Sequence, residues 1–172
     1  LAALASHYGV STEQLLVGRG SDEGIDLLTR AFCRAGADAV IICPPTFGMY
    51  AVAARIQGAA VVNVPLGKDY ALDDAGVIAA LDPRVKLVWL CSPNNPTGNS
   101  LDSAAIRRVL EAARGRSLVV VDEAYSEFSA QASWVGSLAE YPHLVILRTL
   151  SKAQGLAGAR IGTVIAAPTV IR

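Results

Sequence analysis

The fold is indicated most clearly by LVVVDEAY, residues 118–125, in which four consecutive apolar residues lead directly into an acidic pair. A strand with one face in water alternates apolar and polar residues, and this run has no such alternation. Continuous apolar runs are typical of parallel strands whose two faces are both covered by helices. The stretch therefore predicts a buried strand, Leu118–Val121, that ends at Asp122 in an α/β fold.

Six further runs share this pattern and are predicted as strands: Leu15–Gly18, Ala39–Cys43, Ala59–Pro65, Lys86–Cys91, Leu144–Thr149 and Ile161–Ala166. Between them lie stretches with helical spacing of apolar residues: Asp22–Arg34, Phe47–Gln57, Asp73–Leu81 and Ser103–Arg114. Gly36 is expected to end the first of these helices, and Thr12–Gln14 is too short to assign. Strands that alternate with helices predict one α/β domain with a mainly parallel, doubly wound sheet.

Composition excludes several classes of protein. The 172 residues carry 15 Lys+Arg and 15 Asp+Glu, and a net charge of zero argues against a nucleic-acid-binding surface. Hydrophobic residues make up 52% and charged residues 17%, which excludes a disordered chain. The apolar runs are too short for a membrane helix. Cys33, Cys43 and Cys91 have no metal-ligand spacing, so we expect free buried thiols in a cytoplasmic protein.

Polar residues gather directly after the predicted strands, where ligands bind in doubly wound sheets. Gly20-Ser21-Asp22 opens a helix, Phe47 follows a Pro-Pro turn, and Ser92-Pro93-Asn94-Asn95-Pro96-Thr97-Gly98 follows the fourth strand. Asp122-Glu123-Ala124-Tyr125 and Ser151-Lys152 follow the next two strands, and Arg160 ends a stretch of small residues.

Each of these features also has a purely structural interpretation. Serine, as at Ser21, is a common helix N-cap, and turns rich in Pro, Asn and Gly commonly join a strand to the next element. Asp122 can cap the element that follows it. Lys152 is one of only three lysines, with Lys68 and Lys86, and its Gly/Ala-rich surroundings are expected to desolvate the amine. His7 and His143 lie outside every cluster and are not catalytic candidates.

Taken together, these residues point to one cofactor. Asn95, Asp122 and Lys152 on three neighbouring strands would span roughly 10 Å, the size of a substituted pyridine ring. An amine for an imine, a carboxylate for a ring nitrogen and a helix N-terminus for a phosphate together describe a site for pyridoxal 5′-phosphate (PLP).

The chain resembles the large domain of fold-type-I PLP-dependent aminotransferases and, within them, the histidinol-phosphate aminotransferase family. The resemblance covers nearly the whole chain and is strongest in CPPTFGMY (43–50), SPNNPTG (92–98), DEAY (122–125) and RTLSKA (148–153). It implies a three-layer α/β/α fold with a seven-stranded, mostly parallel sheet whose last strand is antiparallel. It also implies that residues 1–172 are a PLP-binding large domain, with an N-terminal segment and a C-terminal small domain outside it.

The resemblance also assigns roles to single residues. It implies that Lys152 forms the imine with PLP, that Asp122 pairs with the pyridine nitrogen, and that Tyr125 and Asn95 bind the phenolate oxygen. Lys152, Asp122 and Tyr125 form the catalytic set, and the Phe47 ring stacks on the cofactor. The phosphate is expected to bind the backbone N–H groups of Ser21 and Asp22 and the side chains of Ser151 and Arg160. No metal is expected.

The implied activity is amino transfer from histidinol phosphate to 2-oxoglutarate in histidine biosynthesis, by a homodimer whose substrate-binding arginine lies outside this chain. One alternative is a PLP-dependent decarboxylase of a phosphorylated amino acid, of the threonine-phosphate type. Another is a different class I/II aminotransferase, such as an aromatic one. A non-enzymatic phosphate-binding module is the third, although the chain lacks the G-x-G-x-x-G and Walker sequences of nucleotide-binding proteins.

Overall fold

Seven strands form one mixed sheet in the computed structural model, which describes residues 1–172. The strands, in chain order, are β1 Leu15–Arg19, β2 Ala39–Ile42, β3 Ala60–Asn63, β4 Val85–Cys91, β5 Leu118–Asp122, β6 Leu144–Thr149 and β7 Ile161–Ala166. Their order across the sheet is β1-β7-β6-β5-β4-β2-β3. Six of them match the predicted bounds within one residue.

The sheet is parallel from β6 to β3, whereas β7 runs antiparallel to both of its neighbours, β6 and β1. The expectation of a mostly parallel sheet with an antiparallel last strand is therefore confirmed. In the register of the three central strands, Cys91 of β4 lies opposite Asp122 of β5, and Asp122 lies opposite Leu147 of β6. The carboxyl ends of these strands therefore reach the same edge of the sheet.

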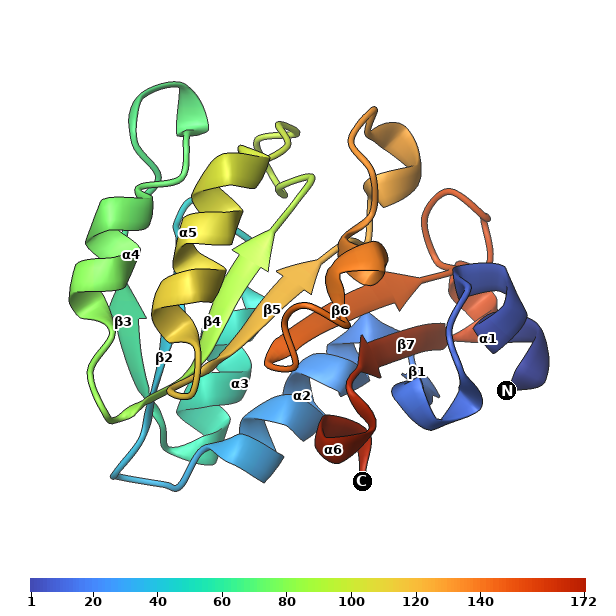
Figure 1. Ribbon diagram of the computed structural model, residues 1–172, viewed down its shortest axis with the longest axis horizontal. Helices are drawn as coiled ribbons and strands as arrows, with labels where there is room; N and C mark the ends of the chain where they lie inside the picture. Colours follow the sequence, from blue (N-terminus) through green and yellow to red (C-terminus); the bar gives the residue numbers. More distant parts are fainter.

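Helices cover both faces of the sheet (Figure 1). Helices α1, α4 and α5 pack on one face, and α2, α3 and α6 pack on the other, which confirms the three-layer fold. Their bounds are α1 Ala2–Tyr8, α2 Ser21–Phe32, α3 Met49–Gln57, α4 Asp74–Ala80, α5 Ser103–Ala113 and α6 Pro168–Ile171. Short 3₁₀ helices span Thr12–Gln14, Lys68–Tyr70, Ser126–Phe128, Trp134–Ser137 and Ala157–Ala159.

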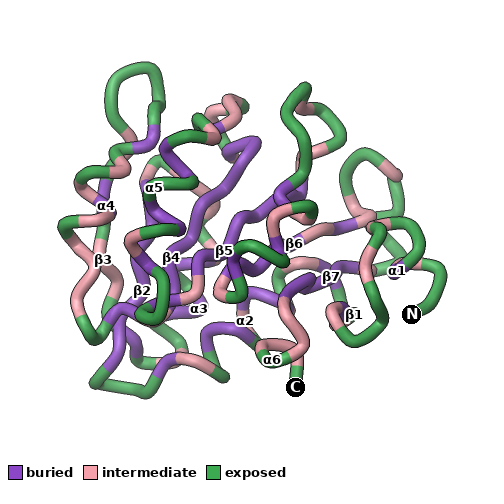
Figure 2. The backbone as a smooth tube through the Cα atoms, in the orientation of Figure 1, coloured by how far each residue is buried: buried purple, intermediate pink, exposed green.

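The central strands are buried on both faces, as their continuous apolar runs predict (Figure 2). Successive side chains of a strand point to opposite faces. In β5, Val119 and Val121 join the apolar cluster beneath α4 and α5, while Val120 joins the cluster beneath α2 and α3. Two cores, one on each face, therefore fix the sheet between the helix layers.

Three boundaries differ from the sequence prediction. The third strand is shorter than Ala59–Pro65 because β3 pairs only with β2, which offers four residues. Helix α3 begins at Met49 rather than Phe47, which stays in the preceding loop. Gly36 does not end α2: the Asp38 carboxylate accepts the Arg34 N–H at 2.8 Å, and the helix already stops at Phe32. Helices α1 and α6 were not predicted.

Every helix is too short or too polar to span a membrane.

Gly162 of β7 permits a close contact between the sheet and the start of α2. A Cβ atom at this position would overlap the backbone of Gly20 and Ser21. Neither backbone segment can move freely, because Gly162 is paired with Gly18 of β1 and with Thr149 of β6. The absence of a side chain at Gly162 thus sets how closely the N-terminus of α2 approaches the sheet edge.

Gly162→Ala should lower the free energy of unfolding of the full-length protein by about 3 kcal/mol, because the added methyl group meets backbone that cannot yield. Denaturant unfolding measures the effect. Gly136→Ala is the matched control, because a Cβ at Gly136 meets nothing within 4 Å. Equal stabilities for the two variants would show that the close contact is not needed.

Candidate active site

One pocket at the carboxyl edge of the sheet collects all of the residues that the sequence singled out. It encloses about 510 Å³, part of it open to solvent. The nine predicted residues that line it are Ser21, Asp22, Phe47, Asn95, Asp122, Tyr125, Ser151, Lys152 and Arg160. Gly20, Cys91, Ala124 and Thr149 complete the lining. Residues more than 130 positions apart in the chain thus meet in a single cavity.

Three neighbouring strands deliver the central side chains of this pocket. Asn95 follows β4, Asp122 is the last residue of β5, and Lys152 follows β6. These strands are adjacent in the sheet, as the spacing argument assumed. The amide, the carboxylate and the amine are therefore presented side by side at one edge.

Asp122 is a buried carboxylate with few partners. Its residue is 2% exposed. Oδ2 accepts a hydrogen bond from the Tyr50 hydroxyl at 2.7 Å, and Oδ1 accepts one from the Ala124 N–H at 3.1 Å. Burial raises the pKa of Asp122 to about 6, even though both of these hydrogen bonds lower it. A carboxylate can accept about four hydrogen bonds, so this one retains capacity for a further donor.

Lys152 differs from the sequence expectation in one respect. The small residues around it do not desolvate the amine, because Lys152 and most of residues 153–160 are exposed. The amine lies over the ring of Tyr125, with Nζ 5.3 Å from the ring centroid. Thr149 shapes the turn that carries it, since its hydroxyl accepts the Ser151 N–H at 3.2 Å. The amine is thus directed over the pocket by the turn and by the aromatic ring.

The N-terminus of α2 and Arg160 form the anion-binding end of the pocket. The first N–H groups of a helix have no partner within it and favour negative charge. Gly20 precedes this helix with φ +83°, and a Cβ there would lie 2.8 Å from the Arg160 guanidinium. The same guanidinium donates to the Arg19 carbonyl at 3.3 Å. The lack of a side chain at Gly20 therefore leaves room for a cation beside the free N–H groups.

Sequence reasoning gave no role to Glu123, which anchors the end of β5 on the opposite face from the pocket. Its carboxylate accepts hydrogen bonds from the Ser133 hydroxyl and the Trp134 N–H, both at 2.7 Å, and from Arg148 Nη1 at 2.9 Å. The Arg148 guanidinium in turn lies over the Tyr8 ring. This network ties the segment that carries Asp122 and Tyr125 to β6.

Asn94 was also missed, and it joins the two loops that flank the pocket. Its amide nitrogen donates to the Pro45 carbonyl at 2.9 Å and to the Thr97 hydroxyl at 2.7 Å. Its amide oxygen accepts the Thr46 hydroxyl at 2.9 Å. Asn94 is only 4% exposed, so water does not compete for these bonds. It therefore fixes the loop of Phe47 relative to the loop of Asn95.

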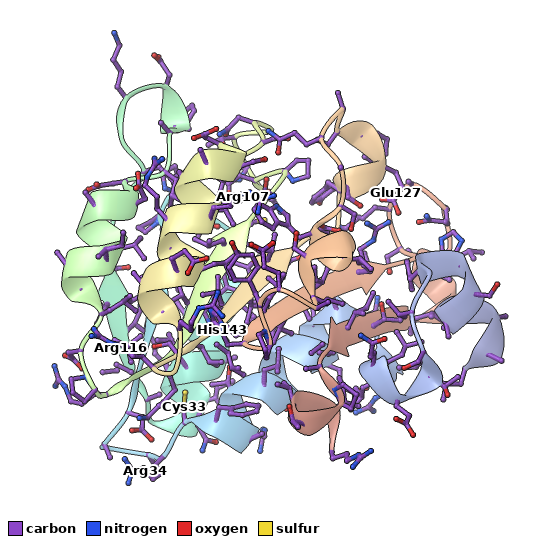
Figure 3. All side chains as sticks on the ribbon, in the orientation of Figure 1. Cys33, Arg34, Arg107, Arg116, Glu127 and His143 are labelled. Carbon is purple, nitrogen blue, oxygen red and sulfur yellow. The ribbon has the colours of Figure 1, made fainter.

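Other reactive side chains lie elsewhere. Figure 3 shows Cys33 and His143 toward the end of the sheet opposite to Glu127, which lies near the carboxyl edge. His143 Nε2 is 2.8 Å from the Leu110 carbonyl, a structural contact. Both residues are therefore outside the pocket, as the sequence predicted for the histidine.

The pocket can bind a ligand that has an anionic group at one end and a planar ring with a basic nitrogen at the other. The helix start and Arg160 suit the anion, Phe47 and Tyr125 supply aromatic surface, and Asp122 suits a protonated ring nitrogen. Lys152 adds a nucleophilic amine.

Known proteins of one class are similar to this chain. The sequence model of the family described as "Aminotransferase class I and II" matches residues 1–172. The histidinol-phosphate aminotransferase of Sodalis glossinidius (strain morsitans) is 57% identical over 168 residues, which are 98% of this chain and 46% of that protein. The chain thus spans about half the length of the curated relatives it matches.

Two solved structures have a similar fold. The histidinol-phosphate aminotransferase from Sinorhizobium meliloti, solved in complex with pyridoxal-5′-phosphate, superposes with a TM-score of 0.86 at 32% identity, covering 99% of this chain and 46% of that one. The L-threonine-O-3-phosphate decarboxylase from Porphyromonas gingivalis superposes with a TM-score of 0.82 at 26% identity, covering 99% and 52%.

Asn94→Ala should loosen the pocket loops and lower the free energy of unfolding of the full-length protein by roughly 2 kcal/mol, because buried partners lose their hydrogen bonds. Hydrogen exchange should accelerate at residues 46–48 and 93–98. Asn99→Ala is the control, because Asn99 contacts Thr97 and the Tyr70 carbonyl without touching the Phe47 loop. Unchanged exchange at 46–48 in Asn94→Ala would contradict the role given to Asn94.

Proposed function

Because the chain belongs to the aminotransferase class I and II family, we propose that the full-length protein is a PLP-dependent transaminase. Its amino donor is histidinol phosphate, and its amino acceptor is a 2-oxo acid, 2-oxoglutarate. The observation that carries the proposal is the convergence of nine predicted residues in one pocket. The 57% identity to a histidinol-phosphate aminotransferase supports the choice of donor.

The residues of the pocket fit PLP. Asp122 is a buried carboxylate with unused acceptor capacity and a raised pKa, so a protonated pyridine nitrogen would supply the cationic donor that it lacks. Gly20 leaves free N–H groups beside the Arg160 guanidinium, an arrangement suited to a phosphate. Lys152 is the only lysine that lines the pocket.

When bound, PLP supplies an aldehyde that condenses with amines and a ring that withdraws electrons from the α-carbon of the substrate. Lys152 would hold the cofactor through its amine, and binding of the amino donor would release that amine. The released amine then takes the proton from the α-carbon of the donor, so Lys152 Nζ is the base of the reaction. The pocket holds no second amine that could take this role.

The remaining side chains orient the cofactor and stabilise its charge. Asp122 would hold a proton on the ring nitrogen, and Asn95 and Tyr125 would donate to the phenolate oxygen. Phe47 covers one face of the ring. The backbone N–H groups of Ser21 and Asp22 and the side chains of Ser151 and Arg160 would hold the phosphate, because all four donate hydrogen bonds and Arg160 is cationic.

The resemblance to fold-type-I aminotransferases supports further proposals on assembly, location and domain organisation. The protein is a homodimer, and it works in the cytoplasm on small-molecule substrates. Residues 1–172 form its PLP-binding large domain, and the residues that recognise the donor lie mainly outside this chain.

Decarboxylation of a phosphorylated amino acid is the second candidate activity. The structural similarity to the L-threonine-O-3-phosphate decarboxylase supports it, at lower identity. The two reactions share the cofactor-binding groups and differ in which bond at the α-carbon is broken. Histidinol phosphate has no carboxyl group, so it can undergo only the first reaction.

The purified full-length protein should form glutamate from histidinol phosphate and 2-oxoglutarate, and it should release no CO₂ from threonine phosphate. Lys152→Ala should lower the rate of amino transfer by about 10³-fold, because it removes the base. Lys68→Ala, which lies outside the pocket, is the matched control and should retain the rate. CO₂ release without glutamate formation would replace the proposal by the decarboxylase.

A further inference from the structure

Tyr50 is a fully buried tyrosine whose hydroxyl reaches the pocket from behind. It belongs to α3 and is 0% exposed. Its hydroxyl donates to Asp122 Oδ2 at 2.7 Å, a contact that spans 72 residues of sequence. Asp122 has no other side-chain donor, since its second partner is the backbone N–H of Ala124. Tyr50 is therefore the one side chain that holds this carboxylate in place.

The Tyr50 ring is held from two sides. It stacks on Trp89 with 4.9 Å between centroids and 8° between planes. It also meets Phe47 edge to face, at 5.6 Å and 81°. These contacts fix the plane of the ring and therefore the place of its hydroxyl oxygen. The same ring thus supports Phe47 through its edge and Asp122 through its hydroxyl.

A space-filling role alone does not explain the hydroxyl. A phenylalanine would pack against Trp89 and Phe47 with the same ring, and it would bury no polar atom. A buried hydroxyl is stabilising only when it has a partner. Here the partner is the carboxylate at the floor of the pocket.

The charges around Asp122 make this hydrogen bond important. Burial is the main cause that raises the pKa of Asp122, and Asp22 of α2 and the adjacent Glu123 raise it further. The Tyr50 hydroxyl lowers it more than the Ala124 N–H does. The Cys91 thiol of β4 also faces Tyr50, and burial raises its pKa to about 12, so it stays neutral at pH 7. Tyr50 is therefore the main side chain that favours the ionised form of Asp122 before a ligand binds.

We propose that Tyr50 is a positioning residue that orients the Asp122 carboxylate and keeps it charged, so that it is ready to receive a protonated ring nitrogen. The inference rests on the proposed function for the identity of the ligand, and on the geometry of this chain for the role of the hydroxyl.

The test uses the full-length protein with two buried tyrosines changed to phenylalanine. Tyr50→Phe removes the hydroxyl at Asp122, and Tyr141→Phe removes a buried hydroxyl on the other face of the sheet. In the cofactor-free protein, the carboxyl stretch of Asp122 is followed by infrared difference spectroscopy as the pH is changed, and it is identified by its absence in Asp122→Asn. The pH at which half of Asp122 is protonated, the Asp122 midpoint, should rise by about one pH unit in Tyr50→Phe and stay unchanged in Tyr141→Phe.

A second readout uses PLP itself. At pH 7, Tyr50→Phe should bind PLP about twofold more weakly than the wild type, because about half of its Asp122 is protonated there. The difference should approach tenfold near pH 5 and disappear at higher pH, where Asp122 is ionised in both proteins. An Asp122 midpoint that does not move in Tyr50→Phe overturns the role of the hydroxyl. A wild-type protein that fails to bind PLP overturns the proposed function instead, and the infrared titration still decides the role of Tyr50.

A second substitution is expected to shift the Asp122 midpoint in the opposite direction, so the proposal can be tested even if Tyr50→Phe does not fold. Site-specific 3-fluorotyrosine at position 50 preserves the ring and makes the hydroxyl a stronger donor. The Asp122 midpoint should then fall below that of the wild type. A midpoint that rises, or that stays at the wild-type value, contradicts the proposal.

Discussion

Parallel pairing of β4, β5 and β6 is the constraint on which the site depends. Because the strands run in the same direction and in register, Cys91, Asp122 and Leu147 lie at one level of the sheet. The loops that follow must then start from neighbouring points, about 4.8 Å apart. Asn95, Asp122 and Lys152 come from distant parts of the chain, and this register is what brings them together. A slip of one residue in β5 would turn Asp122 to the opposite face, toward the network of Glu123 and Arg148.

Burial of the Asp122 carboxylate lowers the stability of the folded chain at neutral pH. The pKa of Asp122 is about 6 in the folded chain, above the value of about 4 for an exposed aspartate. Between these values the folded state binds more protons than the unfolded state, so the contribution of Asp122 to stability falls as pH rises through that interval. At neutral pH the carboxylate is mostly ionised, supported by Tyr50 and Ala124. A cationic ligand would recover part of this cost, which is the physical reason for expecting a ring nitrogen there.

The sequence was most informative where chemistry is local. The central strands could be predicted from apolar runs such as Leu144–Thr149, because a strand covered on both faces needs no polar residue. The pocket residues could be predicted from the motifs in the loops that follow the strands. Contacts that form only in the folded chain could not be read in this way. The partner of Asp122 is 72 residues away, and Asn94 reaches back 49 residues to Pro45. The exposure of Lys152 was mistaken because small neighbours indicate a close approach of backbone and not, by themselves, a covered side chain.

The central claim is that this pocket holds PLP through Lys152, and covalent mapping tests it most directly. The full-length protein is incubated with PLP, reduced with sodium borohydride and digested, and the peptides are identified by mass spectrometry. The account predicts one pyridoxyl label, on the peptide that contains Lys152. A label on Lys68 or Lys86, or no label on any lysine of this chain, would contradict it.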